Sequence, residues 1–596
     1  MFRVWAPQTS RVEVIFSEPA HPPLHLLPDG NGFHSGVSAD ARAGALYRYR
    51  LDDTGLFPDP YSRFQPSGPH GPSMVVDPRT FEWTDAQWPG LRSHNQVIYE
   101  LHVGAATAEG TFTSLIANLG VIKELGATCI ELMPVAEFAG RWGWGYDGVD
   151  LFAPFHHYGS PDELRELVNR AHNIGLGVIL DVVYNHVGAD GNYLPNFSKD
   201  YFTDEHGSEW GETFNYSCEA VRRFAIDNAA YWIREFHFDG LRLDATQNIH
   251  DPKYPTLLAT LSTEARAAAG PRTIIISAED HLQRASLVRP PEAGGAGLDH
   301  LWNDDFHHAA RVALTGTHAG YFCNYRGRAH ELLATFKHGF LFQGQQDAWL
   351  KKPRGTSTRN VPTSAFVVFT QNHDQVANTL CGRRLSSLVN PSRNRALTAA
   401  LLLGPQTPLI FMGQESDSPT PFPYFADYQG TVAEQLWANR KREIRGFEQY
   451  ATPAAQLQIL DPCAPDTFQL AKLGGKHGSG NDLTRRLYQD LLALRPAPSV
   501  PSGHSHPAEG SVLNERTFLW RWFDSDGLDR LLLINLGEEV DRRTYAEPLL
   551  APPAGRSWRL RWSSEDPKYG GLGAVDPVTP EGWYLQAESA SLLIAG

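Results

Sequence analysis

The stretch "FDGLRLDAT" (Phe238–Thr246) places an arginine and an aspartate within a run that otherwise resembles a buried strand. Side chains alternate along a strand, so Leu241 and Leu243 share one face while Arg242 and Asp244 share the other. If the leucines pack against surrounding helices, the arginine and the aspartate point into a polar interior. A fold with a polar centre at the ends of its strands would explain this pattern.

The same alternation of apolar strand and helix continues on both sides of this stretch. Seven more runs are predicted strands: "NQVIYELHV", "ATCIELMPV", "LGVILDVVYNH", "RTIIISAED", "LDHLWNDDF", "SAFVVFTQNHD" and "TPLIFMGQE". Helical patterns such as "PDELRELVNRAHNIG" lie between them. Strands that alternate with helices are parallel, and eight of them favour a closed barrel over an open sheet. The central fold is therefore predicted to be a (β/α)8 TIM barrel.

The regions on both sides of the barrel change to short alternating runs. The first region contains "RVEVIF" and "LYRYRLDD", and the last hundred residues contain "RTFLWRWF" and "RLLLINL". Such runs are typical of antiparallel β domains. We therefore expect a multidomain protein with an N-terminal β-sandwich (1–92), a (β/α)8 barrel with loop insertions (93–495) and a C-terminal β-sandwich domain (496–596).

Composition narrows the class of protein. The net charge of −15 argues against a polyanionic partner, so we expect no nucleic-acid partner. No apolar run reaches the roughly 18 residues that a membrane span needs, so no membrane partner is expected either. The five cysteines lack CxxC spacing and are interpreted as reduced thiols. Because "MFRVWAPQTSRVEVIF" lacks the pattern of a secretory signal, we expect a cytoplasmic protein.

Carboxylates stand at the carboxyl ends of several predicted strands, where a (β/α)8 barrel carries its active site. Asp244 ends the "GLRLDA" strand, Glu279 ends "SAED", and Asp374 ends "QNHD". Cleavage of a glycosidic bond needs one ionised carboxylate as nucleophile or base and one protonated carboxyl as acid. Asp244, kept ionised by Arg242, suits the first part and Glu279 the second. Asp374 would bind sugar hydroxyls and favour the positively charged transition state.

Each of these groups has an ordinary structural alternative. A single aspartate at a strand end more often turns the chain or caps a helix, and this is the role that we expect for Asp239. A lone arginine or histidine there usually makes a structural ion pair or hydrogen bond. The convergence of three carboxylates and an arginine on one rim favours the catalytic interpretation.

The segments "DVVYNH", "GLRLDAT", "SAED" and "QNHDQ" resemble, in order and position, the motifs of the α-amylase family of glycoside hydrolases and transferases. The resemblance implies that Asp244 is the nucleophile, Glu279 the general acid/base and Asp374 the transition-state stabiliser. The family retains anomeric configuration, which implies about 5–5.5 Å between the Asp244 and Glu279 carboxyls. The resemblance also implies a set of substrate-binding residues around the −1 sugar: Tyr146, Asp147, His186, Arg242, Asn372 and His373.

Other segments resemble one part of that family. "FRVWAPQTSRVEVIF" is similar to the carbohydrate-binding-like β-sandwich of branching, debranching and trehalose-forming members. "LWNDDFHHAARVALTG" and "KHGFLFQGQ" resemble the members that release trehalose. This resemblance implies an oligosaccharide substrate, maltooligosyltrehalose, cleaved at the α-1,4 bond next to its terminal trehalose. A debranching or branching enzyme of the same family and a non-catalytic glucan-binding protein are the alternatives.

No cofactor and no required metal are expected, because the sequence holds no dense Asp and Asn cluster of the kind that calcium needs. His307 and His308, at the start of a predicted helix, are interpreted as surface histidines and not as metal ligands. Several loop aromatics could stack on sugar rings: Trp142, Trp144, Tyr193, Trp210, Trp302 and Phe342.

Overall fold

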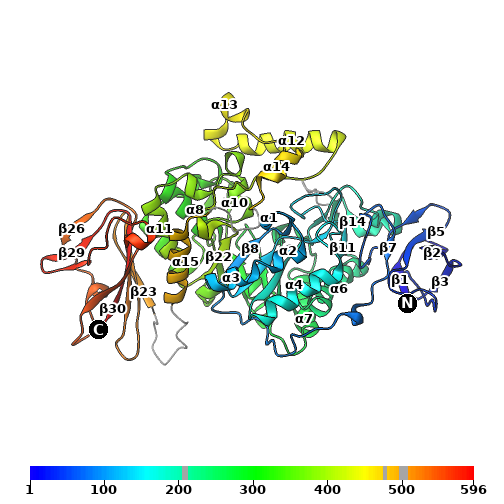
Figure 1. The fold of residues 1–596 in the computed structure, drawn as a ribbon, viewed down its shortest axis with the longest axis horizontal. Coiled ribbons are helices and arrows are strands. Elements are labelled where there is room, and N and C mark those ends of the chain that lie inside the picture. Colours follow the sequence, from blue (N-terminus) through cyan, green and yellow to red (C-terminus); the bar gives the residue numbers. More distant parts are fainter. Residues whose placement is uncertain (205–211, 474–479, 496–507) are drawn as a thin grey trace.

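A computed structural model describes residues 1–204, 212–473, 480–495 and 508–596 of the chain. A central barrel separates an N-terminal sheet from a C-terminal pair of sheets, which lie at opposite ends of the molecule (Figure 1). All five cysteines lie within the described residues and are unbonded. No helix in the described part of the chain is long and apolar enough to cross a membrane.

Eight parallel strands close the central barrel, and all eight predicted strands are confirmed. Every residue in these strands is buried, which explains why they read as nearly continuous apolar runs. In barrel order the strands are β12 (Gly177–Val182), β16 (Gly240–Leu243), β17 (Ile275–Ala278), β18 (His300–Trp302), β21 (Phe366–Val368), β22 (Thr407–Phe411), β8 (Ile98–Leu101) and β9 (Cys129–Leu132).

Helices between the strands surround the barrel. The helix predicted from "PDELRELVNRAHNIG" is α4, and Ser160 and Glu163 form a capping box at its start. Pro161 occupies the first helical turn, where its missing N–H costs nothing. The main surrounding helices are α3 (Leu119–Leu125), α4 (Pro161–Asn173), α6 (Glu219–Glu235), α7 (Thr256–Ala268), α8 (Asp304–Thr315), α9 (Ala329–His338), α11 (Pro391–Leu403) and α15 (Asp482–Leu494).

Antiparallel sheets lie on both sides of the barrel, as predicted. The N-terminal sheet has the order β1-β4-β3-β2-β5-β6, with β7 paired to β5. Its strands are β1 (Phe2–Trp5), β2 (Val12–Glu18), β3 (Leu24–Pro28), β4 (Phe33–Gly36), β5 (Leu46–Leu51), β6 (Leu56–Phe57) and β7 (Ser73–Met74).

The C-terminal region contains a five-stranded and a three-stranded sheet that share one apolar core. Leu519, Leu531 and Leu593 of the larger sheet pack in this core with Val540 and Leu585 of the smaller one. The strands of the larger sheet are β23 (Ala508–Asn514), β24 (Thr517–Trp522), β25 (Arg530–Asn535), β30 (Ser589–Ala595) and β27 (Trp558–Ser563). Those of the smaller sheet are β26 (Val540–Arg543), β29 (Gly582–Leu585) and β28 (Val578–Thr579).

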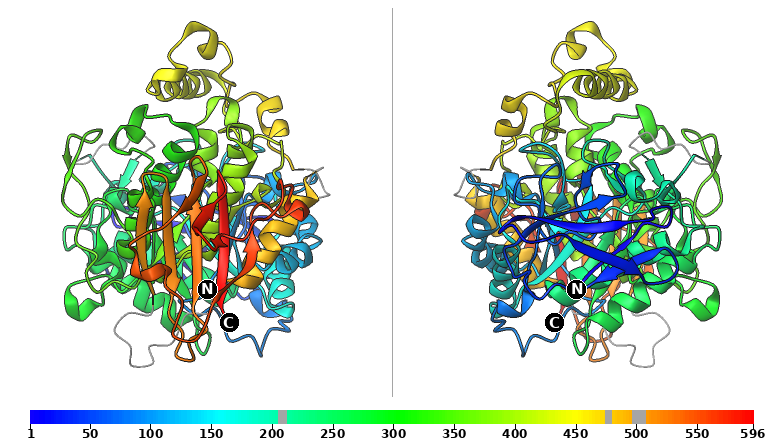
Figure 2. Two further views of the ribbon diagram at one scale, coloured as in Figure 1. Left: turned by 90° about the vertical axis from the view of Figure 1, so that its left-hand side faces the viewer. Right: turned by 90° about the vertical axis from the view of Figure 1, so that its right-hand side faces the viewer.

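Insertions follow several barrel strands at their carboxyl ends. After β22, the helices α12 (Gly430–Arg445), α13 (Pro453–Gln456) and α14 (Pro465–Leu470) project from the barrel (Figures 1 and 2). After β9, a hairpin of β10 (Ala136–Glu137) and β11 (Asp150–Pro154) returns over the barrel. Both insertions begin at the carboxyl end of the barrel, the end at which this fold carries its polar side chains.

Candidate active site

The three expected carboxylates lie after barrel strands. Asp244 directly follows β16, Glu279 directly follows β17, and Asp374 is the second residue of α10 (His373–Ala377), which comes after β21. The exposed fractions of the three side chains are 13%, 21% and 47%, respectively, so each can be reached from solvent. Parallel strands bring these positions to one end of the barrel.

Arg242 is the centre of the cluster. It is fully buried on β16, paired in register with Asp181 on β12. Its Nη1 donates to both oxygens of Asp181, at 2.9 and 2.8 Å, and to Oδ1 of Asp244 at 2.9 Å. Its Nη2 donates to Oε2 of Glu279 at 2.6 Å. One guanidinium therefore holds Asp244 and Glu279 beside each other.

Asp244 is fixed at its other oxygen by Asn185. The Asn185 Nδ2 donates to Asp244 Oδ2 at 2.8 Å and to the Asp244 backbone oxygen at 3.1 Å. Asn185 Oδ1 pairs with Nδ1 of His186, which must carry the proton because an amide oxygen can only accept. With Arg242 at Oδ1 and Asn185 at Oδ2, the Asp244 carboxylate is held in one orientation.

His373 carries a positive charge in this cluster. Its Nδ1 pairs with Glu100 Oε1, while its Nε2 lies 2.9 Å from Tyr146 Oη and 3.6 Å from Asp374 Oδ2. Burial opposes the charged form, but Asp374 and Glu100 outweigh burial and raise the pKa of His373 to about 9. At neutral pH both ring nitrogens therefore donate. Tyr146 Oη in turn donates to Asp181 Oδ2 at 2.6 Å, which links His373 to the arginine side of the cluster.

Asp181 lies between Arg242 and Tyr146 and accepts hydrogen bonds from both. Burial raises the pKa of Asp181 to about 7, although the neighbouring Arg242 acts in the opposite direction. The Asp244 carboxylate also contributes to this rise. The proton content of the cluster therefore changes near neutral pH.

Tyr146 and Asp147 reach the cluster from the loop between β10 and β11. Burial raises the pKa of Asp147, while His186 opposes this rise. The loop is positioned by close contact with Gly188, where an added Cβ would lie 2.2 Å from the backbone oxygen of Asp147. Burial also lowers the pKa of His186, which favours its neutral ring beside Asp147.

Asn372 has a structural partner. Its Oδ1 accepts a hydrogen bond from the backbone N of Gln375 at 2.8 Å and so caps the start of α10. This cap sets the direction of the short helix that carries His373 and Asp374. Contact between Asn372 and substrate stays a prediction.

Two carboxylates inside the barrel were missed by the sequence reasoning. Glu100 on β8 and Glu131 on β9 are buried and paired in register. Glu100 orients His373, as described above. Burial, together with Glu100 and Asp181, raises the pKa of Glu131 well above its usual range. The available signal was a single charged residue within each of the apolar runs "VIYELHV" and "CIELMPV".

The interpretation of His307 and His308 as surface histidines is wrong. Both side chains are buried, and the His308 ring lies 4.6 Å from the ring of Tyr321 and 5.1 Å from that of Phe322. Burial lowers the pKa of His307 to about 3 and that of His308 well below its usual range. Within the described ranges, no three or more His, Cys, Asp or Glu side chains are grouped so as to hold a metal ion.

The aromatic residues proposed for sugar stacking divide into two groups. Trp142, Trp144 and Trp302 are buried, whereas Tyr193 and Phe342 are partly exposed. Trp302 supports the cluster, since the Arg242 guanidinium lies 4.2 Å from its ring centre. Trp210 lies outside the described residues.

Comparisons with known families and structures identify the family of the chain. Residues 75–213 match the family model described as "Alpha amylase, catalytic domain", and residues 506–585 match a domain of unknown function, DUF3459. A crystal structure titled as an alpha amylase from Salmonella typhimurium has a TM-score of 0.86 at 33% identity, covering 100% of this chain and 97% of that chain. Pullulanase type I from Bacillus subtilis, at 20% identity and a TM-score of 0.65, covers 100% of this chain and 83% of its own and shares the fold alone.

Curated relatives extend the match over most of the chain. A malto-oligosyltrehalose trehalohydrolase from Deinococcus radiodurans is 40% identical over 92% of this chain and 88% of its own length. The protein of the same name from Saccharolobus solfataricus is 38% identical over 83% of this chain and 84% of its own. A 1,4-alpha-glucan branching enzyme from Rhodospirillum rubrum matches at 35% over 42% of this chain and 37% of its own. The chain therefore belongs to the malto-oligosyltrehalose trehalohydrolases of the α-amylase family.

Proposed function

We propose that the protein is a retaining glycoside hydrolase that releases trehalose. Its substrate is maltooligosyltrehalose, and it cleaves the α-1,4 bond next to the terminal trehalose to leave a maltooligosaccharide. The observation that carries the chemistry is the shared guanidinium of Arg242, which contacts both Asp244 and Glu279. The similarity to trehalohydrolases over most of the chain carries the substrate.

In the first step, Asp244 acts as the nucleophile. Its carboxylate forms a bond to the anomeric carbon of the maltooligosaccharide while the bond from that carbon to the glycosidic oxygen breaks. Glu279 transfers its proton to that oxygen, and trehalose leaves as a neutral sugar. The hydrogen bonds from Arg242 and Asn185 hold the Asp244 carboxylate in a fixed orientation.

In the second step, Glu279 acts as a general base instead of a general acid. Glu279 accepts a proton from a water molecule, whose oxygen forms a bond to the anomeric carbon as the bond to Asp244 breaks. The product keeps the configuration of the substrate. A retaining pair of carboxyls requires a separation of about 5–5.5 Å. Hydrogen bonds from one arginine to both carboxyl groups support such a short separation.

The remaining predicted residues are assigned to the sugar that is being cleaved. Asp374, the most exposed of the three carboxylates, would bind hydroxyls and stabilise the positive charge of the transition state. The other substrate-binding residues in this proposal are Tyr146, Asp147, His186, Arg242, Asn372 and His373. Direct contact with sugar is a proposal for each of them.

A product assay tests the substrate assignment. The protein is incubated separately with maltooligosyltrehalose, a linear maltooligosaccharide and a branched dextrin, and the products are separated and identified. Free trehalose should be the main product from maltooligosyltrehalose. The number of α-1,6 branches in the dextrin should not change. If branching or debranching dominates, the protein is a branching or debranching enzyme of the same family. The match to the branching enzyme covers less than half of the chain and therefore supports this alternative less than the trehalohydrolases.

The intact carboxylates argue against a non-catalytic glucan-binding protein, because such a protein has no need for all three.

We also propose the domain boundaries expected from the sequence, after residues 92 and 495. The N-terminal strands end at Met74, the barrel strands begin at Ile98, and the C-terminal strands begin at Ala508. The second boundary adjoins residues 496–507, which lie outside the described residues. Unbonded cysteines support our proposal of a cytoplasmic location.

A further inference from the structure

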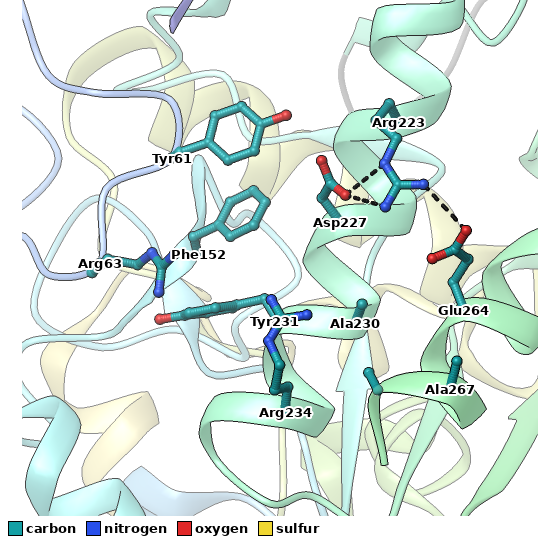
Figure 3. Close-up of a pocket in the computed structure, with 11 residues that line it drawn as sticks. Tyr61, Arg63, Phe152, Arg223, Asp227, Ala230, Tyr231, Arg234, Glu264 and Ala267 are labelled. Atoms are coloured by element: carbon teal, nitrogen blue, oxygen red, sulfur yellow. Dashed lines mark hydrogen bonds and ion pairs between the residues drawn. The ribbon is translucent and has the colours of Figure 1, made fainter. Parts of the chain in front are cut away.

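A cavity of about 500 Å³ opens on the outer side of the barrel. Its walls come from the segment Tyr61–Arg63, from Phe152 on β11, and from the helices α6 and α7 (Figure 3). The residues that line it do not include any member of the catalytic cluster. Its volume lies within the range of roughly 300–1,000 Å³ that is usual for small-molecule sites.

One wall of this cavity is aromatic. The Tyr61 ring lies 4.6 Å from the Phe152 ring, and the Phe224 ring meets the Tyr61 ring edge-on at 5.1 Å. Tyr231 lies beside them, with the Arg63 guanidinium 4.4 Å from its ring centre. Figure 3 shows the three labelled rings, Tyr61, Phe152 and Tyr231, on one side of the cavity. Phe152 and Tyr231 are buried and support the partly exposed Tyr61, which is the ring on which the apolar face of a sugar can stack.

The opposite wall offers polar groups in fixed positions. Arg223 on α6 donates through Nε to Asp227 Oδ1 at 2.6 Å and through Nη1 to Glu264 Oε1 of α7 at 3.4 Å. These two helices keep the three planar groups in place across the cavity from the aromatic wall (Figure 3). Ala230 and Ala267 leave the space between the two walls open.

The charges of the cavity are balanced. Three arginines line it, namely Arg63, Arg223 and Arg234. Asp227 and Glu264 oppose them within the wall, and Glu235 pairs with Arg63 at its edge. An anionic ligand would meet two carboxylates as well as the arginines. A neutral ligand with many hydroxyls can donate to the carboxylates, accept from the arginines and stack on the aromatic wall.

We infer that this cavity is a second carbohydrate-binding site, separate from the active site, that takes a glucosyl unit. Tyr61 of the aromatic wall would hold the face of the sugar ring, and Arg223, Asp227 and Glu264 would bind its hydroxyls. The choice of glucose among the neutral sugars rests on the proposed function. The unit can come from a maltooligosaccharide chain or from trehalose, and the test below separates these sources.

The test measures binding stoichiometry by calorimetry in the slow variant Glu279→Gln, titrated with maltoheptaose and, separately, with trehalose. At least one of the two sugars should bind at two sites. Adding Ala267→Trp, which fills the cavity from an exposed helical position, should reduce that number to one. The matched control Thr260→Trp lies on the same exposed side of α7, about 10 Å earlier, and should leave both sites.

The isosteric change Asp227→Asn gives a second measurement that does not depend on added bulk, and it should weaken the second site. A single site for both sugars, or a second site that Ala267→Trp and Asp227→Asn leave unchanged, would overturn the inference. So would competition of inorganic phosphate for the second site, because that result indicates an anion site. Trehalose release by the parent protein is assayed separately, so failure of the second site and failure of the proposed function are distinguishable.

Discussion

Strand β16 has a buried charged cluster at each end, and the two clusters differ in how completely their charges are paired. At the amino end, Asp239 accepts hydrogen bonds from Trp88 Nε1 at 2.7 Å, His172 Nε2 at 2.8 Å and the backbone N of Val178 at 2.9 Å. The other ring nitrogen of His172 pairs with Asp85 at 2.8 Å, and Arg272 and His237 complete the set at 3.6 Å from Asp239 and 2.8 Å from Asp85. We call Asp85, Trp88, His172 and Asp239 the linker clamp, because it ties the segment after the N-terminal sheet to the barrel.

At the carboxyl end, one guanidinium serves three carboxylates, those of Asp181, Asp244 and Glu279. Two of these also face solvent, whereas the side chains of His172 and Asp239 in the linker clamp have no exposed surface. A closed set of donors and acceptors stabilises the fold. A set with surplus carboxylates and an open side can bind and transform a ligand. Pairing and access therefore separate the structural cluster from the catalytic one.

The largest expected effect is on turnover, in the variant Glu279→Gln. Loss of the proton donor should lower kcat by roughly 10²- to 10⁴-fold while the apparent Tm stays close to that of the parent. Trehalose release from maltooligosyltrehalose measures the rate. The exposed Glu292→Gln is a matched control from the same segment between β17 and β18 and should keep full activity. Parent-like turnover in Glu279→Gln would remove Glu279 from the catalytic role.

The same kind of change in the linker clamp should affect stability instead. Asp239→Asn leaves the buried His172 with one carboxylate fewer, and removal of one partner of a buried pair typically costs about 3–5 kcal/mol. Denaturant unfolding should show this loss, while kcat measured on the folded protein at low temperature is unchanged. Asp29→Asn, which breaks an exposed pair with Arg3, should cost about 1 kcal/mol or less. A large fall in kcat for Asp239→Asn would contradict the structural role.

This contrast marks the limit of what the sequence predicts. The barrel strands and the positions of Asp244 and Glu279 follow from local patterns, because buried parallel strands are apolar and polar residues at their ends stand out. Asp239 has the same local pattern, and the expectation that it helps turn the chain into β16 is incomplete. Its partner Trp88 lies far away in sequence, and no local period links the two.

The burial of His307 and His308 was mispredicted for a similar reason. Two adjacent histidines at a helix start suggest a polar surface, but a later segment containing Tyr321 and Phe322 covers them. Glu100 could have been noticed as a lone charge in an apolar strand. Its pairing with His373 joins the first predicted barrel strand to the seventh, a contact that depends on closure of the barrel.

A smaller effect is expected for the charge on His373. Because its pKa is raised to about 9, the ring keeps its proton at neutral pH and loses it as the pH rises through about 9. The parent kcat should therefore fall on the alkaline side with an apparent pKa near that value. His373→Gln should lower kcat by roughly 10²-fold and lack this alkaline fall. The exposed His330→Gln should keep the parent profile. An unchanged alkaline fall in His373→Gln would assign it to another group.

The smallest expected effect is the pH dependence of stability from the linker clamp. Burial opposes the charge on His172, but the hydrogen bonds that His172 donates to Asp239 and Asp85 outweigh burial and raise its pKa. The pKa of Asp85 is lowered, because its hydrogen bonds with His172 and His237 outweigh burial. A raised histidine pKa stabilises the fold fully below the unfolded value of about 6.5, and this contribution is lost as pH rises through the folded value. The lowered carboxyl pKa contributes above the unfolded value of about 3.9 and is lost as pH falls through the folded one.

Both contributions of the linker clamp therefore coincide between about pH 4 and pH 6.5. The free energy of unfolding of the parent minus that of His172→Gln should be greatest in this window and should shrink at higher pH. Denaturant unfolding at a series of pH values measures this difference. His25→Gln, at a largely exposed histidine of the N-terminal sheet, should give a much flatter difference. If the difference for His172→Gln instead grows as pH rises above 6.5, His172 is neutral in the fold and the linker clamp is not an ionic cluster.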